Sequence, residues 1–182
     1  MDIVLAIQAL YPTAILNTDY YLTDNSDGQG TNIANWNTIK LGTQPTIASL
    51  ETYYTDNLAL PQAQQAQIAS LTLSCSSTIT AGYTSSALGS VYTYGNNTID
   101  QLNMASSVIA ALINANTANW TTPMWCENSA GVWEYMQHTA AQVNEVGVSG
   151  KTFVVANQTK LANLKTQVNA ATTIEAVQAI TW

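Results

Sequence analysis

Apolar residues at helical spacing run through most of this chain, and two stretches replace that spacing with pairs of short strand-like runs around turn residues. The first stretch, residues 19–36, has a turn cluster at 24–30. The second stretch, residues 120–136, has a loop at 127–131. Strand-like and helical runs do not alternate in the order that builds a parallel sheet. The sequence therefore predicts an α+β fold, mostly helical, with two small β-hairpins and no parallel sheet.

Capping and stop residues divide the helical part of the chain. Thr46 is placed to cap one helix, Pro61 suits the first turn of the next, and Gly82 ends that helix. Thr172–Glu175 resembles a capping box before the last helix. The expected helices cover residues 2–10, 60–81, 98–115, 138–146, 151–170 and 173–180, with a further helix after Thr46, and the expected strands cover residues 19–23, 31–36, 91–94, 120–126 and 132–136.

The helix expected at 98–115 has the most regular apolar pattern. Either Asn97 or Thr98 is placed to cap it. Its apolar residues recur at spacings close to one helical turn, and they are Ile99, Leu102, Ala105, Ile109 and Leu112.

A change in composition near residues 58–61 marks the expected domain boundary. The hairpin-and-helix start of the chain there gives way to a glutamine-rich helix. We expect an N-terminal attachment or docking domain at 1–58 and a second domain at 59–182. The glutamine-rich helix is compatible with several copies packing about a shared axis, with Ile68, Leu71 and Cys75 facing inward.

The chain carries few charges. Charged residues make up 8 % of its 182 residues, the net charge is −7, and arginine is absent; soluble domains typically have about 25 % charged residues. Because nucleic acids and anionic membrane surfaces are bound through Lys and Arg, we expect neither as a partner. No apolar run is long enough to span a bilayer and no secretory signal is recognisable, so synthesis in a cytoplasm is expected.

No arrangement of residues predicts a catalytic site. His138 is the only histidine, and its place at a strand-to-helix junction favours a structural role. Cys126 precedes it across the hairpin, which leaves a Cys–His nucleophile as a remote alternative. Glu127 and Glu134 flank the hairpin loop, where paired carboxylates could run glycoside chemistry but solvated acids are more common. We therefore expect that the protein is not an enzyme.

No cofactor or metal site is expected. Asp24, Asn25 and Asp27 superficially suggest a calcium loop, but the acidic residue about twelve positions after the first ligand is missing. Two cysteines with one histidine cannot supply the four ligands of a structural zinc site. Phosphate-binding glycine motifs are absent as well.

The two cysteines, Cys75 and Cys126, leave two interpretations open. Both can be buried thiols that act as small apolar residues. Alternatively, at least one forms a disulfide, internal or to a partner, if the protein ends in an oxidising environment. Cys126 is the better candidate for such a bond, because a hairpin position should lie nearer the surface than the middle of a helix.

Aromatic residues are frequent, with five tryptophans and nine tyrosines. Trp120, Trp125 and Trp133 gather around the second hairpin, and Trp182 is the last residue. Such side chains either pack in the core or form a partner interface or a sugar-stacking surface.

Seven blocks of residues form an ordered pattern in the second part of the chain. They are Cys75, Gly82–Gly89, Tyr92–Tyr94, Asp100–Asn103, Trp125-Cys126 with Val132-Trp133, His138–Gln142, and Ile180–Trp182. In this order and spacing, residues 75–182 resemble an uncharacterised domain family at the C-terminal end of bacteriophage tail-fibre and fibre-associated proteins.

The N-terminal part carries a second, weaker resemblance. Its matching residues are Leu10-Tyr11-Pro12, Asp19-Tyr20, Asp27-Gly28, Ile33, Trp36-Asn37 and Gln44-Pro45-Thr46. They are similar to small proteins of defective, contractile-tailed prophages that are encoded beside the tail-fibre protein.

These resemblances imply a structural component of a contractile-tailed phage, either a short tail fibre or a baseplate-attached fibre protein involved in tail assembly and host attachment. They imply a virion protein made in the host cytoplasm, self-associated as a homotrimer, with baseplate or tail proteins and a host surface receptor as partners. The alternative is a tail-fibre assembly chaperone absent from the mature virion, because Trp36 and Gln44-Pro45-Thr46 also resemble fibre-assembly proteins.

Overall fold

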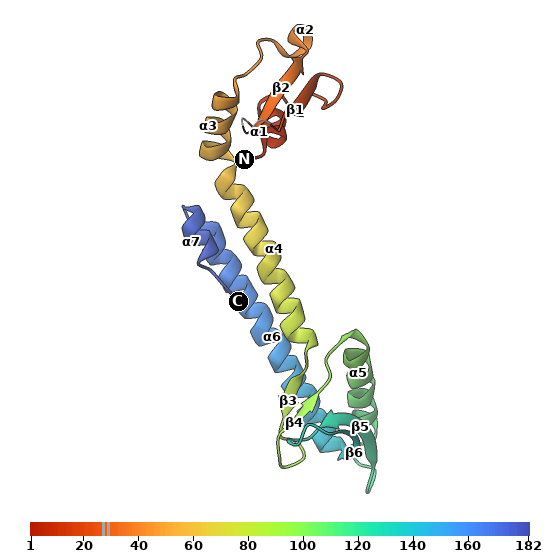
Figure 1. Cartoon of the computed structure of the whole chain (residues 1–182). Coiled ribbons are helices and arrows are strands. Elements are labelled where there is room, and N and C mark those ends of the chain that lie inside the picture. Colours follow the sequence, from red (N-terminus) through yellow and green to blue (C-terminus); the bar gives the residue numbers. More distant parts are fainter. Residues whose placement is uncertain (27, 29) are drawn as a thin grey trace. The chain divides into compact units, whose positions relative to one another are not determined.

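The computed structural model describes residues 1–26, 28 and 30–182, and it divides into two compact units. One unit consists of Met1–Gln67 and Ala171–Ala179, and the other of Ile68–Ala170 and Ile180–Trp182. The long helix α4 (Ala59–Thr80) passes from the first unit into the second (Figure 1).

The first unit is a hairpin packed with short helices. Asp2 caps the first helix by accepting from the backbone N–H of Leu5, and Thr46 caps α3 (Ile47–Asn57) by accepting from that of Ser49, as is usual for short polar side chains at these positions. The pairing of the two strands is antiparallel, as the sequence predicts. The elements are α1 (Ile3–Leu10), β1 (Tyr20–Asp24), β2 (Thr31–Trp36), α2 (Thr38–Leu41), α3 (Ile47–Asn57), the start of α4 (Ala59–Thr80) and α7 (Ile174–Gln178).

A small apolar core holds this unit together. Tyr20 and Leu50 are fully buried in it, and Trp36 packs edge-on against Tyr11. At its margin the carboxylate of Asp19 is buried and accepts from the ammonium of Lys40. The hydrogen bond from Lys40 holds the pKa of Asp19 below its usual range.

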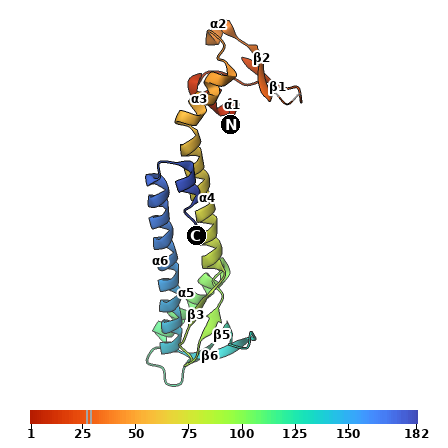
Figure 2. The same cartoon turned by 60° about the vertical axis from the view of Figure 1, so that its left-hand side comes forward.

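The second unit is built around a four-stranded antiparallel sheet, whose strands follow the order β3 (Tyr83–Ser85), β4 (Tyr92–Tyr94), β5 (Thr121–Glu127) and β6 (Trp133–Thr139). The buried rings of Tyr83 and Tyr94 lie against each other in its core, where Val143 and Val146 also pack. Figure 2 shows α6 (Ala140–Ala170) beside the later part of α4, where the thiol of Cys75 contacts the carbonyl of Asn157. Besides these strands and α6, the unit contains the remainder of α4 and the helix α5 (Thr98–Ile113).

The predicted fold class is confirmed. The described residues form an α+β protein with more helix than strand, and their two sheets are antiparallel. The second predicted hairpin is the β5–β6 half of a larger sheet, because β3 and β4 add two short strands to it. The sequence missed β3, whose three residues are too few to show an alternating pattern and lack the close pair of flanking glycines, Gly89 and Gly95, that bounds β4. None of the described helices is both long and apolar enough to cross a membrane.

Two predicted helix ends are wrong. A break was expected between residues 146 and 151, where two glycines stand, but α6 continues without interruption. Gly147 and Gly150 are there for close packing: a Cβ on Gly147 would lie 2.7 Å from Val108, and one on Gly150 would lie 2.7 Å from the Tyr83 ring. The last helix is capped by Thr173 alone, which accepts from the backbone of Ala176, so the predicted capping box at Thr172–Glu175 is not formed.

The predicted inward face of α4 is also corrected. Leu71 and Cys75 are 2 % and 4 % exposed within a single copy of the chain. They are already covered by the chain's own packing, since Cys75 contacts α6. These residues therefore offer no free surface for packing between copies.

The apolar stripe of α5 correctly predicted a helix, but that stripe faces outward. Ile99, Leu102, Ile109 and Leu112 are each about 60 % exposed. The side of α5 that packs into the core carries Met104, Val108 and Ala111 instead. Periodicity located the helix without telling which side of it is buried.

Candidate functional site: an aromatic groove beside the second hairpin

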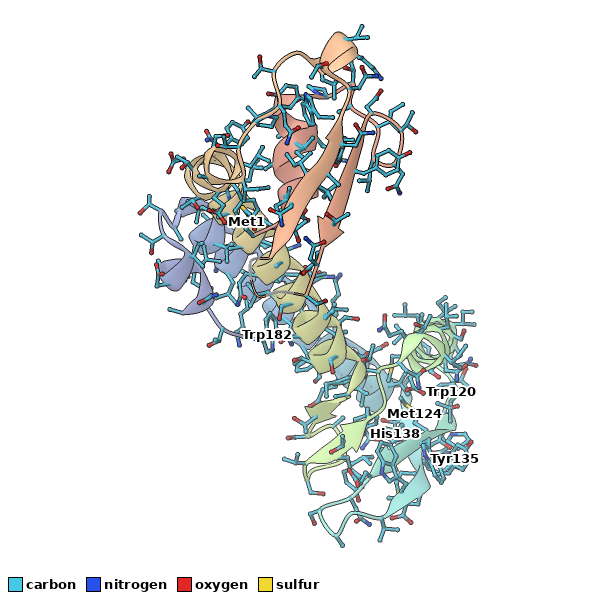
Figure 3. All side chains as sticks on the ribbon, turned by 45° about the horizontal axis from the view of Figure 1, so that its top comes forward. Met1, Trp120, Met124, Tyr135, His138 and Trp182 are labelled. Carbon is cyan, nitrogen blue, oxygen red and sulfur yellow. The ribbon has the colours of Figure 1, made fainter. Side chains whose placement is uncertain are left out.

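The β5–β6 hairpin separates its residues onto two faces. Residues that pair across the two strands project to the same face, and successive residues project to opposite faces. Met124 pairs with Met136 on the core side, while Trp125 pairs with Tyr135 on the outer side. In Figure 3 Tyr135 lies at the outside of this hairpin and His138 on its other side.

Three aromatic rings gather on the outer face. Trp125 and Trp133 are nearly parallel, at an interplanar angle of 23° with their ring centroids 6.4 Å apart. Tyr135 meets Trp125 edge-on at 4.8 Å. Exposed fractions of 50 %, 37 % and 69 % for Trp125, Trp133 and Tyr135 leave large parts of these rings open to solvent.

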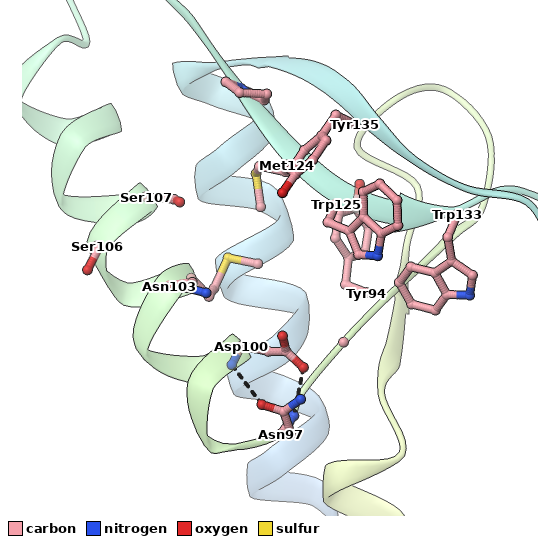
Figure 4. Close-up of a pocket in the computed structure, with 13 residues that line it drawn as sticks. Tyr94, Asn97, Asp100, Asn103, Ser106, Ser107, Met124, Trp125, Trp133 and Tyr135 are labelled. Carbon is pink, nitrogen blue, oxygen red and sulfur yellow. Dashed lines mark hydrogen bonds between the residues drawn. The ribbon is translucent and has the colours of Figure 1, made fainter.

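A groove of about 750 Å³ lies between this hairpin and α5. β4 pairs with β5 at Glu127 and Cys126 only, so the adjoining edge of β5 is left open to the groove. Tyr94, Met104 and Met124 line its inner part and are largely buried. Figure 4 shows the polar side chains of α5 on one side of the groove and the aromatic rings on the other.

The helix side of the groove is polar. Asp100, Asn103 and Ser107 follow one another at spacings of three and four, which places them on one face of α5. Asn97 and Asp100 form a capping box, with Asp100 Oδ2 accepting from the backbone N–H of Asn97 at 3.1 Å. Gly95 makes room for this carboxylate, which would overlap a Cβ at that position.

Two of these polar groups have no partner of their own. Within the described part of the chain, nothing hydrogen-bonds the side-chain amide of Asn103 or the hydroxyl of Ser107. Asp100 is the one charged residue among the described residues that line the groove. The groove therefore combines flat apolar rings with neutral donors and acceptors and one carboxylate.

A buried hydrogen-bonded pair supports the inner part of the groove. The hydroxyl of Tyr94 lies 2.8 Å from Nε2 of His138, and Nδ1 of His138 lies 2.8 Å from the carbonyl oxygen of Met136. Burial lowers the pKa of His138 and raises the pKa of Tyr94. Both side chains are thus held in their neutral forms, which fits the structural role expected of His138.

Cys126 is fully buried next to Tyr94, so the expectation that it lies near the surface is wrong. Its place on the core side of β5 explains the burial, because Met124 and Cys126 alternate with the outward Trp125. Burial also raises the pKa of the Cys126 thiol, which disfavours the thiolate form that a nucleophile needs.

Both thiols are free and buried in this structure. Of the two interpretations left open, their burial supports small apolar residues, while a disulfide in the mature particle stays a prediction.

The two glutamates of the hairpin do not converge. Glu127 pairs with Trp133 and Glu134 pairs with Cys126, and these neighbouring pairs project to opposite faces of the hairpin. The amide of Asn128 donates to Glu134. In the described residues no group of three or more His, Cys, Asp or Glu side chains is arranged to hold a metal ion, and Asp27 of the considered calcium loop lies outside those residues.

The structure divides the four predicted interface tryptophans. Trp125 and Trp133 lie together at the groove, whereas Trp120 is half-buried and packs against the core. Trp182 donates from its indole N–H to the hydroxyl of Thr78 and lies under the ammonium of Lys160 at 4.3 Å, so it secures the end of the chain. Sequence reasoning missed Tyr135, although its alternation with Trp133 was a signal that both rings share one face.

Two family models match consecutive parts of the chain. The model described as "XkdW protein" matches residues 3–62. The model described as "Domain of unknown function (DUF4376)" matches residues 62–181, which is more than half of the chain. The chain belongs to the DUF4376 family. No curated protein and no solved structure matches it.

The DUF4376 match contains every residue that lines the groove. The XkdW match contains the first hairpin and the helices α1 to α3. Because the XkdW family is phage-associated, the match supports the coarser expectation of a phage protein. Neither match specifies a tail fibre, a baseplate or a chaperone.

Proposed function

We propose that the protein is a structural component of a contractile-tailed phage, a short tail-fibre or baseplate-attached fibre protein that takes part in tail assembly and host attachment. In this proposal it is made in the host cytoplasm, becomes part of the virion tail, and associates with itself and with baseplate or tail proteins. It binds no nucleic acid, inserts into no membrane, and has no enzymatic activity.

The observation that carries this proposal is the outward face of α5, which we call the α5 stripe (Ile99, Leu102, Ile109, Leu112 and Ile113). All five side chains are more than half exposed in the single chain. Single soluble proteins rarely expose a contiguous apolar patch of this kind, and such a patch commonly marks a protein–protein interface. The stripe therefore supports a subunit whose surface is covered in an assembly.

The spacing of the stripe favours contact with another helix. Ile99, Leu102, Ile109 and Ile113 fall at positions that alternate by three and four along two heptads, with Ser106 between them. We propose that these helices pack against each other between copies. A homotrimer is proposed by analogy with phage fibres, since the stripe is too short to determine how many copies of the helix pack together.

The absence of enzymatic activity is supported by the chemistry of the second unit. The imidazole of His138 is buried and occupied at both ring nitrogens, and the pKa of the Cys126 thiol is raised. This is the opposite of the lowered thiol pKa that a Cys–His nucleophile requires.

A fibre-assembly chaperone is the second candidate, because an exposed apolar stripe could also bind the apolar surface of a fibre protein before that protein is assembled. The two candidates differ in what the purified protein does alone. A fibre subunit associates with itself, whereas a chaperone without its client should remain monomeric.

Multi-angle light scattering of the purified chain at micromolar concentration tests the proposal. We expect an oligomer, and we expect Leu102→Asp/Ile109→Asp to give a monomer because two charges would be buried in the interface. Leu73→Asp is the matched control, since Leu73 is 72 % exposed on α4 and should leave the oligomer intact. Circular dichroism confirms that each variant is folded. A wild-type monomer would reject the fibre proposal and favour the chaperone.

A further inference from the structure

We infer that the groove between α5 and the β5–β6 hairpin is a binding site for a neutral glycan. The inference deepens the host-attachment part of the proposed function by naming the substrate class. Its ligand chemistry follows from the walls of the groove.

The aromatic wall suits the apolar face of a sugar ring. A pyranose presents one face of C–H groups and a rim of hydroxyls, and the C–H face packs on the flat side of an indole or phenol ring. Trp125 and Trp133 supply two nearly parallel rings, and Tyr135 stands edge-on to the first of them. Because all three rings are partly exposed, they are available for such packing.

The polar wall suits the hydroxyl rim. The amide of Asn103 can donate and accept, the hydroxyl of Ser107 can do the same, and Asp100 can accept through Oδ1 while Oδ2 remains in the capping box. Figure 4 shows Asn103 and Ser107 on the opposite side of the groove from Trp125 and Tyr135. A few convergent polar groups facing an apolar wall are what a small-molecule site requires.

The charges of the groove select against anionic ligands. Asp100 is the one charge among the described lining residues, and the whole chain has four lysines with a net charge of −7. A uronate, a sialic acid or a phosphate-bearing polymer would meet a carboxylate and no cation. A single-stranded nucleic acid would stack on the rings but would find no compensation for its phosphates.

The open edge of β5 does not favour an added peptide strand. Pro123 stands in the middle of that edge and lines the groove. Proline has no N–H to donate to a neighbouring strand, and prolines on edge strands hinder such pairing. A neutral glycan therefore suits the two walls of the groove, its single negative charge and the open edge of β5 better than a peptide or a nucleic acid does.

The test uses the purified full chain on an array of immobilised oligosaccharides, with neutral hexose and N-acetylhexosamine oligomers beside uronate-containing and sialylated ones. Calorimetric titration then measures the affinity for the best-bound glycan. We expect binding to at least one neutral oligosaccharide and none to the anionic ones. Trp125→Ala should weaken the affinity about tenfold or more, because a stacking surface is lost.

Asn103→Ala should weaken binding several-fold through the lost hydrogen bonds. Tyr21→Ala is the matched control, because Tyr21 is 41 % exposed in the first unit and should leave the affinity unchanged. The inference is overturned if no neutral glycan is retained, if Trp125→Ala binds like the wild type, or if an extended peptide or an oligonucleotide occupies the groove instead. Since the array needs no phage particle, its result is separate from that of any test of virion assembly.

Discussion

The ring of Tyr94 lines the groove, and its hydroxyl bonds the buried imidazole of His138. One side chain thus links the proposed ligand surface to the core of the second unit. Trp125, one strand away, has the opposite disposition, since it is half exposed and bears no core contact of this kind. At the scale of residues, substitutions at Tyr94 and His138 should act on stability, whereas substitutions at Trp125 should act on binding.

The burial of His138 predicts a pH dependence of stability. Its pKa in the folded state lies below the ordinary value of 6.5, because burial disfavours the imidazolium. Below about pH 6.5 the unfolded chain binds a proton that the folded chain does not, so stability is full above this pH and is lost as pH falls. The loss from this one group is at most about 1.4 kcal/mol per pH unit.

Urea unfolding of the wild type and of His138→Gln at pH 7.5, 6.5 and 5.5 measures this effect. We expect the variant to be less stable at pH 7.5 but to lose less stability on acidification. If stability changes with pH in the same way for the two proteins, the pKa of His138 does not differ between the folded and unfolded states and this prediction is wrong.

At the scale of elements, the sequence predicted what local signals encode. Capping by Thr46 and Asn97, and the hairpin around residues 127–131, are local features, and the structure has them. Prediction from the sequence failed where a contact with a residue distant in the sequence determines the local structure. Gly150 resembles a helix break until Tyr83, far away in the sequence, is seen to pack against it.

The candidate site shows the same limit. Trp125 and Trp133 were recognisable because tryptophans near a hairpin are conspicuous, but Asn103 and Ser107 were not. Their relevance depends on α5 lying across the groove from the hairpin, which is a tertiary arrangement. The outward stripe of α5 was likewise invisible, because periodicity does not tell which side of a helix is covered.

The close packing at Gly150 predicts that Gly150→Ala destabilises the second unit. Alanine normally stabilises a helix relative to glycine by about 1 kcal/mol. Here its Cβ would lie 2.7 Å from the Tyr83 ring, and overpacking of this kind costs about 1–3 kcal/mol. Urea unfolding should therefore show a net loss, while the control Val148→Ala, at an exposed position of the same helix, should change stability little. Equal or higher stability of Gly150→Ala would mean that Tyr83 yields without cost.

At the scale of the whole molecule, two matched regions with different surfaces share one chain. The N-terminal region matches a phage-associated family, and the DUF4376 region carries both the α5 stripe and the aromatic groove. In the proposed function the first region docks on the tail, the stripe joins copies, and the groove meets the host surface. The stripe and the groove occupy neighbouring faces of α5 and meet at Ser106, which lies between Leu102 and Ile109 in the stripe and also lines the groove.

The proposed function requires the protein to be part of the finished phage particle. Quantitative mass spectrometry of purified particles, with peptides of the sheath and baseplate as internal standards, tests it most directly. We expect peptides from both family-matched regions at a fixed ratio to the baseplate proteins in every preparation. If these peptides are absent from mature particles while the protein is abundant in the lysate from which the particles were purified, the protein is not a virion component and an assembly chaperone explains its role better.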